Sequence, residues 1–331
     1  MTQPFSHILL AWFAENGREL PWRQTKDPYA IWLSEVIMQQ TRIVQGWAYW
    51  ERFMQHFPKV EDLAAATEDE VLRLWQGLGY YSRARNLHAA AKQIVKQGYF
   101  PNTLEGIRKL KGVGDYTAAA IASIAFDIPA AVVDGNVYRV LGRYFGIDTP
   151  INSTEGKKQF AALAQRLLPE KEASAYNQAV MDFGAIQCTP VSPKCLACPL
   201  NGGCEALRQG RVGSLPVKIK SLKVRTINLS YVYIRYQEKT AIRRRHAGEL
   251  WQGLWDLPLM EDVPEQVRGK AILWRKGVKH VLTHRIVLAD FYLLLSDKRP
   301  SLPDGYIWVR EEQLDDYGKS RLIERLLDSL D

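Results

Sequence analysis

The spacing of apolar residues divides the chain into two parts. From the N-terminus to about residue 185, apolar positions recur at intervals of three and four, as in VLRLWQGL (71–78) and AAAIASIAF (118–126). This spacing predicts amphipathic helices. Gly-Tyr-Phe-Pro at 98–101 and Asp-Ile-Pro at 127–129 predict turns between them. The first residues predict another amphipathic helix and have neither the basic region nor the cleavage site of a signal peptide.

The pattern changes in the last third of the chain. INLSYVYIRY (227–236) and TAIRRRH (240–246) alternate with period two, and IVLADFYLLL (286–295) is an apolar, β-rich run. These segments predict strands, and KSRLIERLLDSL (319–330) predicts a final helix. We therefore expect a mainly α first part, followed by a smaller mixed α/β domain.

Size and charge narrow the class of protein. The chain has 331 residues, which is enough for two domains. Its composition, with 47% hydrophobic and 24% charged residues, is that of an ordinary globular protein. No apolar run reaches the length of a membrane span, so we expect a cytoplasmic protein without a membrane partner. The net charge is +8, and residues 201–226 hold six basic side chains and one acidic one. Such a segment could follow a phosphate backbone, and a solvated linker would explain the charge equally well.

All four cysteines fall in one stretch, CTPVSPKCLACPLNGGC (188–204), with the spacing C-x6-C-x2-C-x5-C. Disulfides are rare in cytosolic proteins, so four clustered thiols predict a metal site with four thiolate ligands. Zinc and a [4Fe–4S] cluster both accept four cysteines. The clustering alone leaves the choice of metal open.

One charged residue, Glu35, lies within the apolar stretch IWLSEVIMQQT (31–41). Most helical glutamates reach solvent or pair with an arginine, and that interpretation suffices for this stretch alone. The alternative is an acid whose pKa is raised by apolar surroundings, so that it can donate a proton.

The stretch LKGVGDYTA (110–118) has the pattern of a helix–hairpin–helix. Gly112 and Gly114 permit a tight turn, and the N–H groups that begin the next helix can hold a phosphate. A plain turn between two helices also favours glycine.

Asp134 follows an apolar run in AAVVDGNVYRVLGR (130–143) and precedes a predicted helix. A helix N-cap is a sufficient role for it. The alternative is a second carboxylate that faces Glu35. An acid and a carboxylate together can cleave a bond at the anomeric carbon of a sugar, where the acid protonates the leaving group and the carboxylate stabilises the developing cation.

Taken in order, several motifs resemble those of the helix–hairpin–helix base-excision glycosylases, and within them the adenine DNA glycosylases of the MutY type. The resemblance covers nearly the whole chain. It rests on LPWR (20–23), DPYAIWLSEVIMQQT (27–41), GLGYYSRARNL (77–87), LKGVGDYTAAAI (110–121), VVDGNVYRVL (132–141), NQAVMDFGAIQC (177–188) and the ordered cysteines.

The resemblance implies a fold and a set of catalytic roles. The fold would be a mainly α helix–hairpin–helix glycosylase with an iron–sulfur loop, followed by a smaller α/β Nudix-like domain. Glu35 matches the general acid of the family, Asp134 the carboxylate that stabilises the oxacarbenium ion, and Asn136 a residue that positions the nucleotide. Tyr116 stands where bifunctional relatives have a lysine that forms a Schiff base, which implies base removal without strand cleavage. The metal ligands of the [4Fe–4S] cluster would be Cys188, Cys195, Cys198 and Cys204.

Further residues match the family's DNA contacts. A duplex hides the bond to be cut, so the nucleotide must be flipped out and its place filled. Gln40 and Tyr80 match residues that wedge into that space. Arg23 and Gln178 match residues that line the base pocket.

The last third resembles the Nudix-like domain with which the family recognises 8-oxoguanine. The family's Phe-Ser-His is here Leu282, Thr283 and His284, so a hydroxyl and the imidazole are kept and the aromatic ring is not. The glutamate-rich helix of a Nudix hydrolase is missing from the sequence, so we expect no pyrophosphatase activity. Two more departures lie in the hairpin, Lys111 in place of a common proline and Asp115 in place of a common basic residue, and we expect Asp115 to point away from the phosphate.

Together these features predict a monofunctional, monomeric glycosylase that excises adenine opposite 8-oxoguanine or guanine in double-stranded DNA. We expect a glycosylase domain over 1–207 with its hairpin at about 105–125, a basic linker over 208–225 and the Nudix-like domain over 226–331. If the protein comes from a bacterium, we expect it to associate with the nucleoid in the cytoplasm. Two rival hypotheses are a glycosylase that acts on another base, such as thymine opposite guanine, and a non-catalytic binder of damaged DNA with a zinc site.

Overall fold

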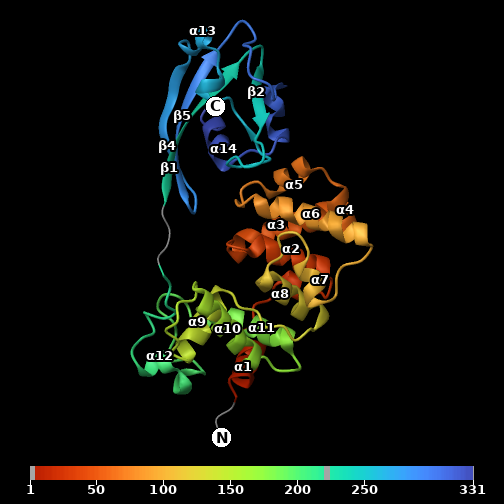
Figure 1. Cartoon of the computed structure of the whole chain (residues 1–331), viewed down its shortest axis with the longest axis vertical. Coiled ribbons are helices and arrows are strands. Elements are labelled where there is room, and N and C mark those ends of the chain that lie inside the picture. Colours follow the sequence, from red (N-terminus) through yellow and green to blue (C-terminus); the bar gives the residue numbers. More distant parts are fainter. Residues whose placement is uncertain (1–3, 220–223, 331) are drawn as a thin grey trace. The chain divides into compact units, whose positions relative to one another are not determined.

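The computed structural model describes residues 4–219 and 224–330 (Figure 1). They form two compact units, the first from residues up to 61 and from 89 to 219, the second from 62 to 88 and from 224 onward. The first unit is helical and the second combines helices with two sheets, so the predicted fold class is confirmed.

Helices α1 to α3 and α7 to α12 build the first unit. Their bounds are α1 (Phe5–Asn16), η1 (Pro21–Arg23), α2 (Pro28–Met38), α3 (Ile43–His56), α7 (Leu104–Arg108), α8 (Asp115–Phe126), α9 (Gly135–Tyr144), α10 (Thr154–Leu167), α11 (Ala173–Asp182), η2 (Phe183–Gln187), η3 (Asn201–Gly203) and α12 (Glu205–Arg208). The N-terminal helix and the turns at 98 and 127 lie where the sequence predicts them, since Gly98 and Asp127 adopt positive φ at helix ends. Helix α2 packs against α3 and α8, and α11 packs against α1 and α8.

The position of α2 determines where Glu35 lies. Asp27 caps the helix by accepting a hydrogen bond from the Tyr29 N–H at 3.0 Å, and Pro28 occupies the first turn, where its missing N–H costs nothing. Eight of the eleven residues of α2 are buried, among them Trp32, which is fully inaccessible and makes edge contacts with Tyr29 and Phe100. An almost entirely buried helix brings every side chain it carries into the protein interior or to its edge.

Two three-stranded sheets and the flanking helices build the second unit. Their bounds are α4 (Val60–Ala65), α5 (Glu68–Trp75), α6 (Ser82–Gln97), β1 (Arg225–Arg235), β2 (Lys239–Arg244), β3 (Trp255–Asp256), η4 (Met260–Asp262), α13 (Glu265–Arg268), β4 (Ile272–Val281), β5 (Arg285–Leu295), β6 (Tyr306–Arg310), η5 (Glu311–Asp316) and α14 (Arg321–Leu327). The division between the two units falls within α4 and α6. The strands and the final helix predicted from the sequence are confirmed.

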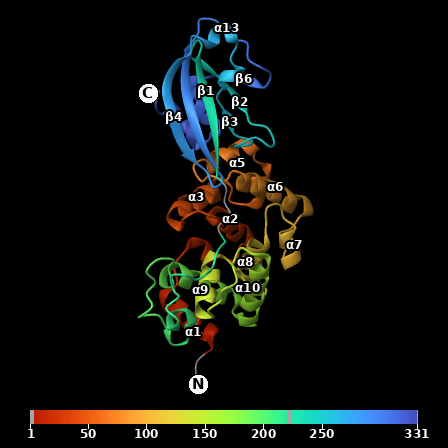
Figure 2. The same ribbon diagram turned by 60° about the vertical axis from the view of Figure 1, so that its left-hand side comes forward.

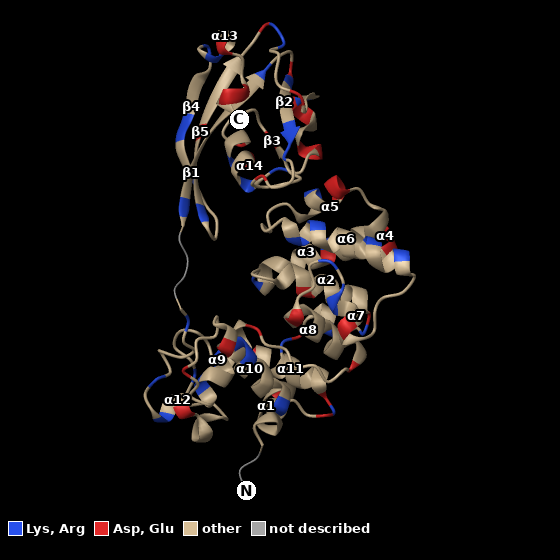
Figure 3. Ribbon diagram, in the orientation of Figure 1, with Lys and Arg blue, Asp and Glu red and all other residues tan. Residues whose placement is uncertain are grey.

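Strand β5 is the centre of the first sheet, in which β1 is parallel and β4 antiparallel to it (Figure 2). The other sheet has the order β3-β2-β6. Tyr231 and Tyr233 of β1 belong to one hydrophobic cluster, which contains residues of α14, whereas Val232 and Ile234 belong to another. Because successive side chains point to opposite faces, β1 is apolar at consecutive positions where both faces are covered. The edge strand β4 carries basic residues, which are coloured blue on its ribbon (Figure 3).

Candidate active site and cysteine loop

Glu35 lies in the last turns of α2 and its carboxylate contacts the start of α8. The Tyr116 hydroxyl donates a hydrogen bond to Glu35 Oε2 at 2.8 Å, and Met181 Sδ lies 3.6 Å from the same hydroxyl. Burial raises the pKa of Glu35 from 4.5 to about 7; the hydrogen bond from Tyr116 opposes this rise, the charge of Asp134 adds to it and that of Arg23 opposes it. A carboxylic acid with this pKa can both hold and release a proton near neutral pH.

Asp134 is the N-cap of α9. Its Oδ1 accepts hydrogen bonds from the N–H groups of Asn136 at 2.9 Å and Val137 at 2.8 Å, and its Oδ2 accepts one from Asn136 Nδ2 at 2.7 Å. Burial raises the pKa of Asp134, and these three hydrogen bonds oppose that rise. The structural role considered from the sequence is therefore present, and the carboxylate also lies close enough to Glu35 to change its pKa.

The glycine hairpin joins α7 to α8. Gly112 has a φ of 77°, which disfavours a side chain, and a Cβ on the N-cap residue Gly114 would meet no atom within 4 Å. Val113 between them is buried. Asp115 forms an ion pair with Arg108 Nε at 3.0 Å. The open space at Gly114 leaves the start of α8 accessible to a phosphate group.

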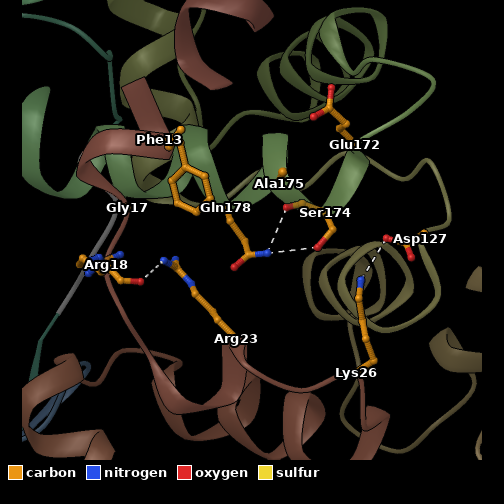
Figure 4. A pocket seen from close by; sticks show the side chains of 11 residues that line it. Phe13, Gly17, Arg18, Arg23, Lys26, Asp127, Glu172, Ser174, Ala175 and Gln178 are labelled. Carbon is orange, nitrogen blue, oxygen red and sulfur yellow. Dashed lines mark hydrogen bonds and ion pairs between the residues drawn. The ribbon is translucent and has the colours of Figure 1, made fainter. Parts of the chain in front are cut away.

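A pocket of about 550 Å³ in the first unit is lined by both residues predicted to contact the base. Arg23 and Gln178 line it, together with Arg18 and Phe13 (Figure 4). The Gln178 amide donates to Ser174 Oγ at 3.1 Å, and Arg23 Nη1 donates to the Arg18 carbonyl at 3.0 Å. The sequence motifs LPWR and NQAVMDFG, which are far apart in the chain, thus contribute to one pocket.

Asp182 and Arg18 of this region have no role predicted from the sequence. Asp182, at the end of α11, has a fully buried side chain and accepts hydrogen bonds from both Arg18 and Arg23. A lone acidic residue in an apolar stretch was the signal that singled out Glu35, and the same signal at Asp182 in AVMDFG would have found it.

The four cysteines line one small cavity with Arg143 and Gln187. Arg143 is 3% exposed, and its Nη1 lies 3.4 Å from Cys188 Sγ and donates to the Thr189 carbonyl at 2.7 Å. Among residues 4–219 and 224–330, no three His, Cys, Asp or Glu side chains converge as they would around a single metal ion. Four thiols around one shared cavity fit a group that is held by several thiolates.

The comparisons with known proteins agree with this geometry. Residues 33–170 match the HhH-GPD superfamily of base excision DNA repair proteins, 188–204 the iron-sulfur binding domain of endonuclease III, and 230–329 the NUDIX domain. An adenine DNA glycosylase of Buchnera aphidicola subsp. Schizaphis graminum is 34% identical over 279 residues, which are 83% of this chain and 79% of that protein.

The chain belongs to the adenine DNA glycosylase family. The adenine DNA glycosylase of Mus musculus is 43% identical over 226 residues, 64% of this chain and 44% of that protein. The solved structure of a thermostable thymine-DNA glycosylase superposes with a TM-score of 0.58 at 31% identity, covering 62% of this chain and 95% of that one.

As a member of this family, the chain is a base-excision repair glycosylase that hydrolyses N-glycosyl bonds. The match over 188–204 assigns the cysteines to a [4Fe–4S] cluster, which decides between the two metals that the spacing left open. The cluster, when bound, would cross-link the loop 188–204 at its four cysteines.

The second unit holds three of the residues predicted to contact DNA, Tyr80, Thr283 and His284. The hydroxyl groups of Tyr80 and Thr283 share a hydrogen bond. Tyr80 is 46% exposed and has a φ of 47°. Thr283 and His284 are exposed in the turn between β4 and β5, whereas Leu282 packs against the hydrophobic cluster beneath it.

Arg83 supports the conformation of the loop before it. Its guanidinium lies 5.0 Å from the Trp75 ring centroid and 5.6 Å from that of Tyr80, and Nη2 donates to the Leu78 and Gly79 carbonyls at 3.4 and 3.3 Å. No role for this arginine was predicted from the sequence.

In the first unit, Gln40 follows α2, is exposed and has a φ of 57°. Left-handed conformations are unfavourable for residues with a Cβ and recur at functional sites. Both predicted wedge residues, Gln40 and Tyr80, share this property.

Two remaining predictions concern the linker and the membrane. Lys218 of the basic segment is exposed, and Lys220 and Lys223 lie outside the described residues. Among the helices of the described residues, none has the length and apolarity required to span a bilayer.

Proposed function

We propose that this glycosylase removes adenine that is mispaired with 8-oxoguanine or guanine in double-stranded DNA, leaving the strand intact. The pairing of Glu35 with Tyr116 and Asp134 carries the proposal, because it places a protonatable acid beside a hydrogen-bonded carboxylate. The names of the relatives support adenine as the base.

In the proposed reaction Glu35 donates its proton to the flipped adenine, most directly at N7, and makes the base a better leaving group. As the C–N bond breaks, positive charge develops on the sugar. Asp134, kept as a carboxylate by hydrogen bonds from Asn136 and Val137, stabilises that charge. Water or a transient adduct with Asp134 then completes the reaction.

The residue at position 116 supports a monofunctional reaction. A phenol cannot form a Schiff base with the sugar, and the Tyr116 hydroxyl is already engaged by Glu35. Treatment with borohydride should therefore trap no covalent enzyme–DNA complex. A trapped complex would overturn this part of the proposal.

The DNA contacts follow from the same proposal. Gly112 and Gly114 let the start of α8 approach a phosphate, and Gln40 and Tyr80 fill the space left by the flipped nucleotide. Arg23 and Gln178 bind the base. Thr283 and His284 read the opposite base from the Nudix-like domain.

For the organisation of the chain we propose a glycosylase domain over 1–207, a basic linker over 208–225 and the Nudix-like domain over 226–331. We expect no pyrophosphatase activity from the last of these. Its α13 (Glu265–Arg268) is a single turn with one glutamate, too short to hold the magnesium ions of a Nudix hydrolase.

Single-turnover release of adenine from a duplex with adenine opposite 8-oxoguanine tests the proposal. Loss of the general acid in Glu35→Gln should lower the rate by about 10²- to 10⁴-fold. Glu51→Gln on the exposed face of α3, where Glu51 accepts a hydrogen bond from Trp47 of the same helix, is a matched control. Equal rates for the native protein and Glu35→Gln would exclude this mechanism.

A second candidate function comes from the solved thymine-DNA glycosylase, which shares 31% identity with this chain. A panel of duplexes with A opposite 8-oxoguanine, A opposite G and T opposite G separates the two. Faster release of thymine than of adenine would favour the second function.

A further inference from the structure

The carboxylate of Asp182 binds two arginine side chains at the wall of the base pocket. Oδ1 accepts from Arg18 Nε at 2.9 Å and from Arg23 Nη2 at 2.8 Å. Oδ2 accepts from the Arg18 backbone N–H at 2.9 Å and from Arg23 Nη1 at 2.8 Å. One carboxylate, which itself has no exposure to solvent, therefore binds both guanidinium groups.

The position of this carboxylate in α11 ties it to the pocket. Gln178 lies one helical turn before Asp182, so both side chains project from the same face of α11. Gln178, Arg18 and Arg23 all line the 550 Å³ pocket. Figure 4 shows Arg23 and Gln178 side by side, with Arg18 next to Arg23.

The charge of Arg23 lowers the pKa of Glu35, the proposed general acid. A positive charge near Glu35 favours its ionised form, which has no proton to donate. Two arginines beside a neutral base would also be costly to bury unless an anion compensates them. Asp182 is the anion that the structure supplies.

We propose that Asp182 is a positioning residue for the base pocket, which fixes the guanidinium groups of Arg18 and Arg23 and offsets the effect of the Arg23 charge on Glu35. This inference rests on the proposed function, in which Glu35 is the general acid. It adds a residue that acts through the arginines without touching the base.

The charges around the two carboxylates support this assignment. Burial alone would raise the pKa of Asp182, but hydrogen bonds from Arg23 and Arg18 lower it to about 2, so it stays ionised throughout the working range. The groups that act on the Glu35 carboxylate are Tyr116 from α8, Asp134 before α9 and Arg23 from η1.

The remaining neighbour of α2 is α3, whose charged side chains are engaged within their own helix. Glu51 accepts a hydrogen bond from Trp47, and Arg52 stacks on Tyr49 at 4.9 Å. The charge of Arg23 thus acts on Glu35, and Asp182 is the ion-pair partner of Arg23.

The decisive measurement is the titration of Glu35 in the full-length holoprotein, by carboxyl ¹³C NMR with glutamate labelling and assignment from Glu35→Gln. Asp182→Asn keeps the shape and removes the charge, so Arg23 should lower the pKa of Glu35 by about one unit. Arg23→Gln should raise it, and the double variant Asp182→Asn, Arg23→Gln should return it toward the native value. The titration needs no substrate, so it decides the inference even if the native protein releases no base.

The same variants predict a specific kinetic signature. Above the pKa of Glu35, Asp182→Asn should release adenine about tenfold more slowly than the native protein, with a smaller loss at low pH. Asp148→Asn removes an exposed partner of Arg211 and should leave the pH profile unchanged.

A merely structural role gives a different pattern. An unchanged pKa of Glu35 in Asp182→Asn, or a rate loss of equal size at every pH, overturns the inference. Absence of base release by the native protein would instead refute the proposed function. The two failures are therefore distinguishable.

Discussion

Tyr80 and Thr283 share a hydrogen bond between their hydroxyl groups although 203 positions separate them in the chain. One is the proposed wedge and the other is proposed to read the base opposite adenine. Both belong to the second compact unit, in which residues 62–88 pack with the Nudix-like part. Further contacts support this packing, since Arg244 forms ion pairs with Glu68 and Asp69 at 3.0 and 3.1 Å.

This hydrogen bond predicts that Tyr80→Phe and Thr283→Val affect the same property. Each should weaken binding to a duplex with 8-oxoguanine by about threefold to tenfold, the range expected for one neutral hydrogen bond. The double variant should lose little more than either single variant, because both remove the same bond. Binding titrations with the four proteins measure the coupling. Tyr99→Phe, at a side chain 63% exposed, is the control, and additive losses would show that the hydroxyl groups act independently.

The hydrogen bond from Tyr116 predicts a shift in the pH dependence of base release. Release requires protonated Glu35, so the rate should fall about tenfold for each pH unit above the pKa of about 7. The Tyr116 hydroxyl lowers that pKa, so Tyr116→Phe should move the falling limb to higher pH while reducing the maximal rate a few-fold through poorer positioning. A limb that moves to lower pH would contradict this sign.

The raised pKa of Glu35 also predicts an effect on stability. The unfolded chain has a pKa near 4.5 at this residue and the folded chain one of about 7, so the stabilising effect of the protonated acid is complete below pH 4.5 and is lost as pH rises through 7. Glu35→Gln should therefore stabilise the protein by about 1–3 kcal/mol at pH 8 and by little at pH 4. Thermal unfolding of the two proteins at both pH values measures the difference. Equal melting temperatures at pH 8 would mean that the pKa is not raised.

The basic segment predicts a change in salt dependence. Neutralising Lys218, Lys220 and Lys223 should weaken binding to every duplex and reduce the slope of log K against log salt by up to about 3, if each lysine neutralises one phosphate. Fluorescence anisotropy between 50 and 200 mM salt gives the slope. Exchange of Lys157 and Lys158, which lie on α10, is the control. An unchanged slope would identify the segment as a solvated linker.

Much of the fold follows from the sequence because its signals are local. The period of apolar residues predicts the helices of the first unit and strands β1, β2 and β5, and Asp134 and the glycine at 98 mark helix ends. The four cysteines predict a metal site by their clustering, and their match to an iron-sulfur domain fixes which metal. The candidate acid stands out because a charge in an apolar stretch is rare.

The tertiary structure decides which of these residues meet. Tyr116 lies 81 positions from Glu35, Arg18 lies 164 from Asp182, and Tyr80 lies 203 from Thr283. Periodicity along the chain reports which face of an element is buried, and it contains no information about the partner across that face. The pKa of Glu35, the pairing of Arg18 and Arg23 with Asp182 and the grouping of residues 62–88 with the Nudix-like part all depend on such partners. They arise only when packing brings distant segments within hydrogen-bond distance, where burial makes each charge depend on its neighbours.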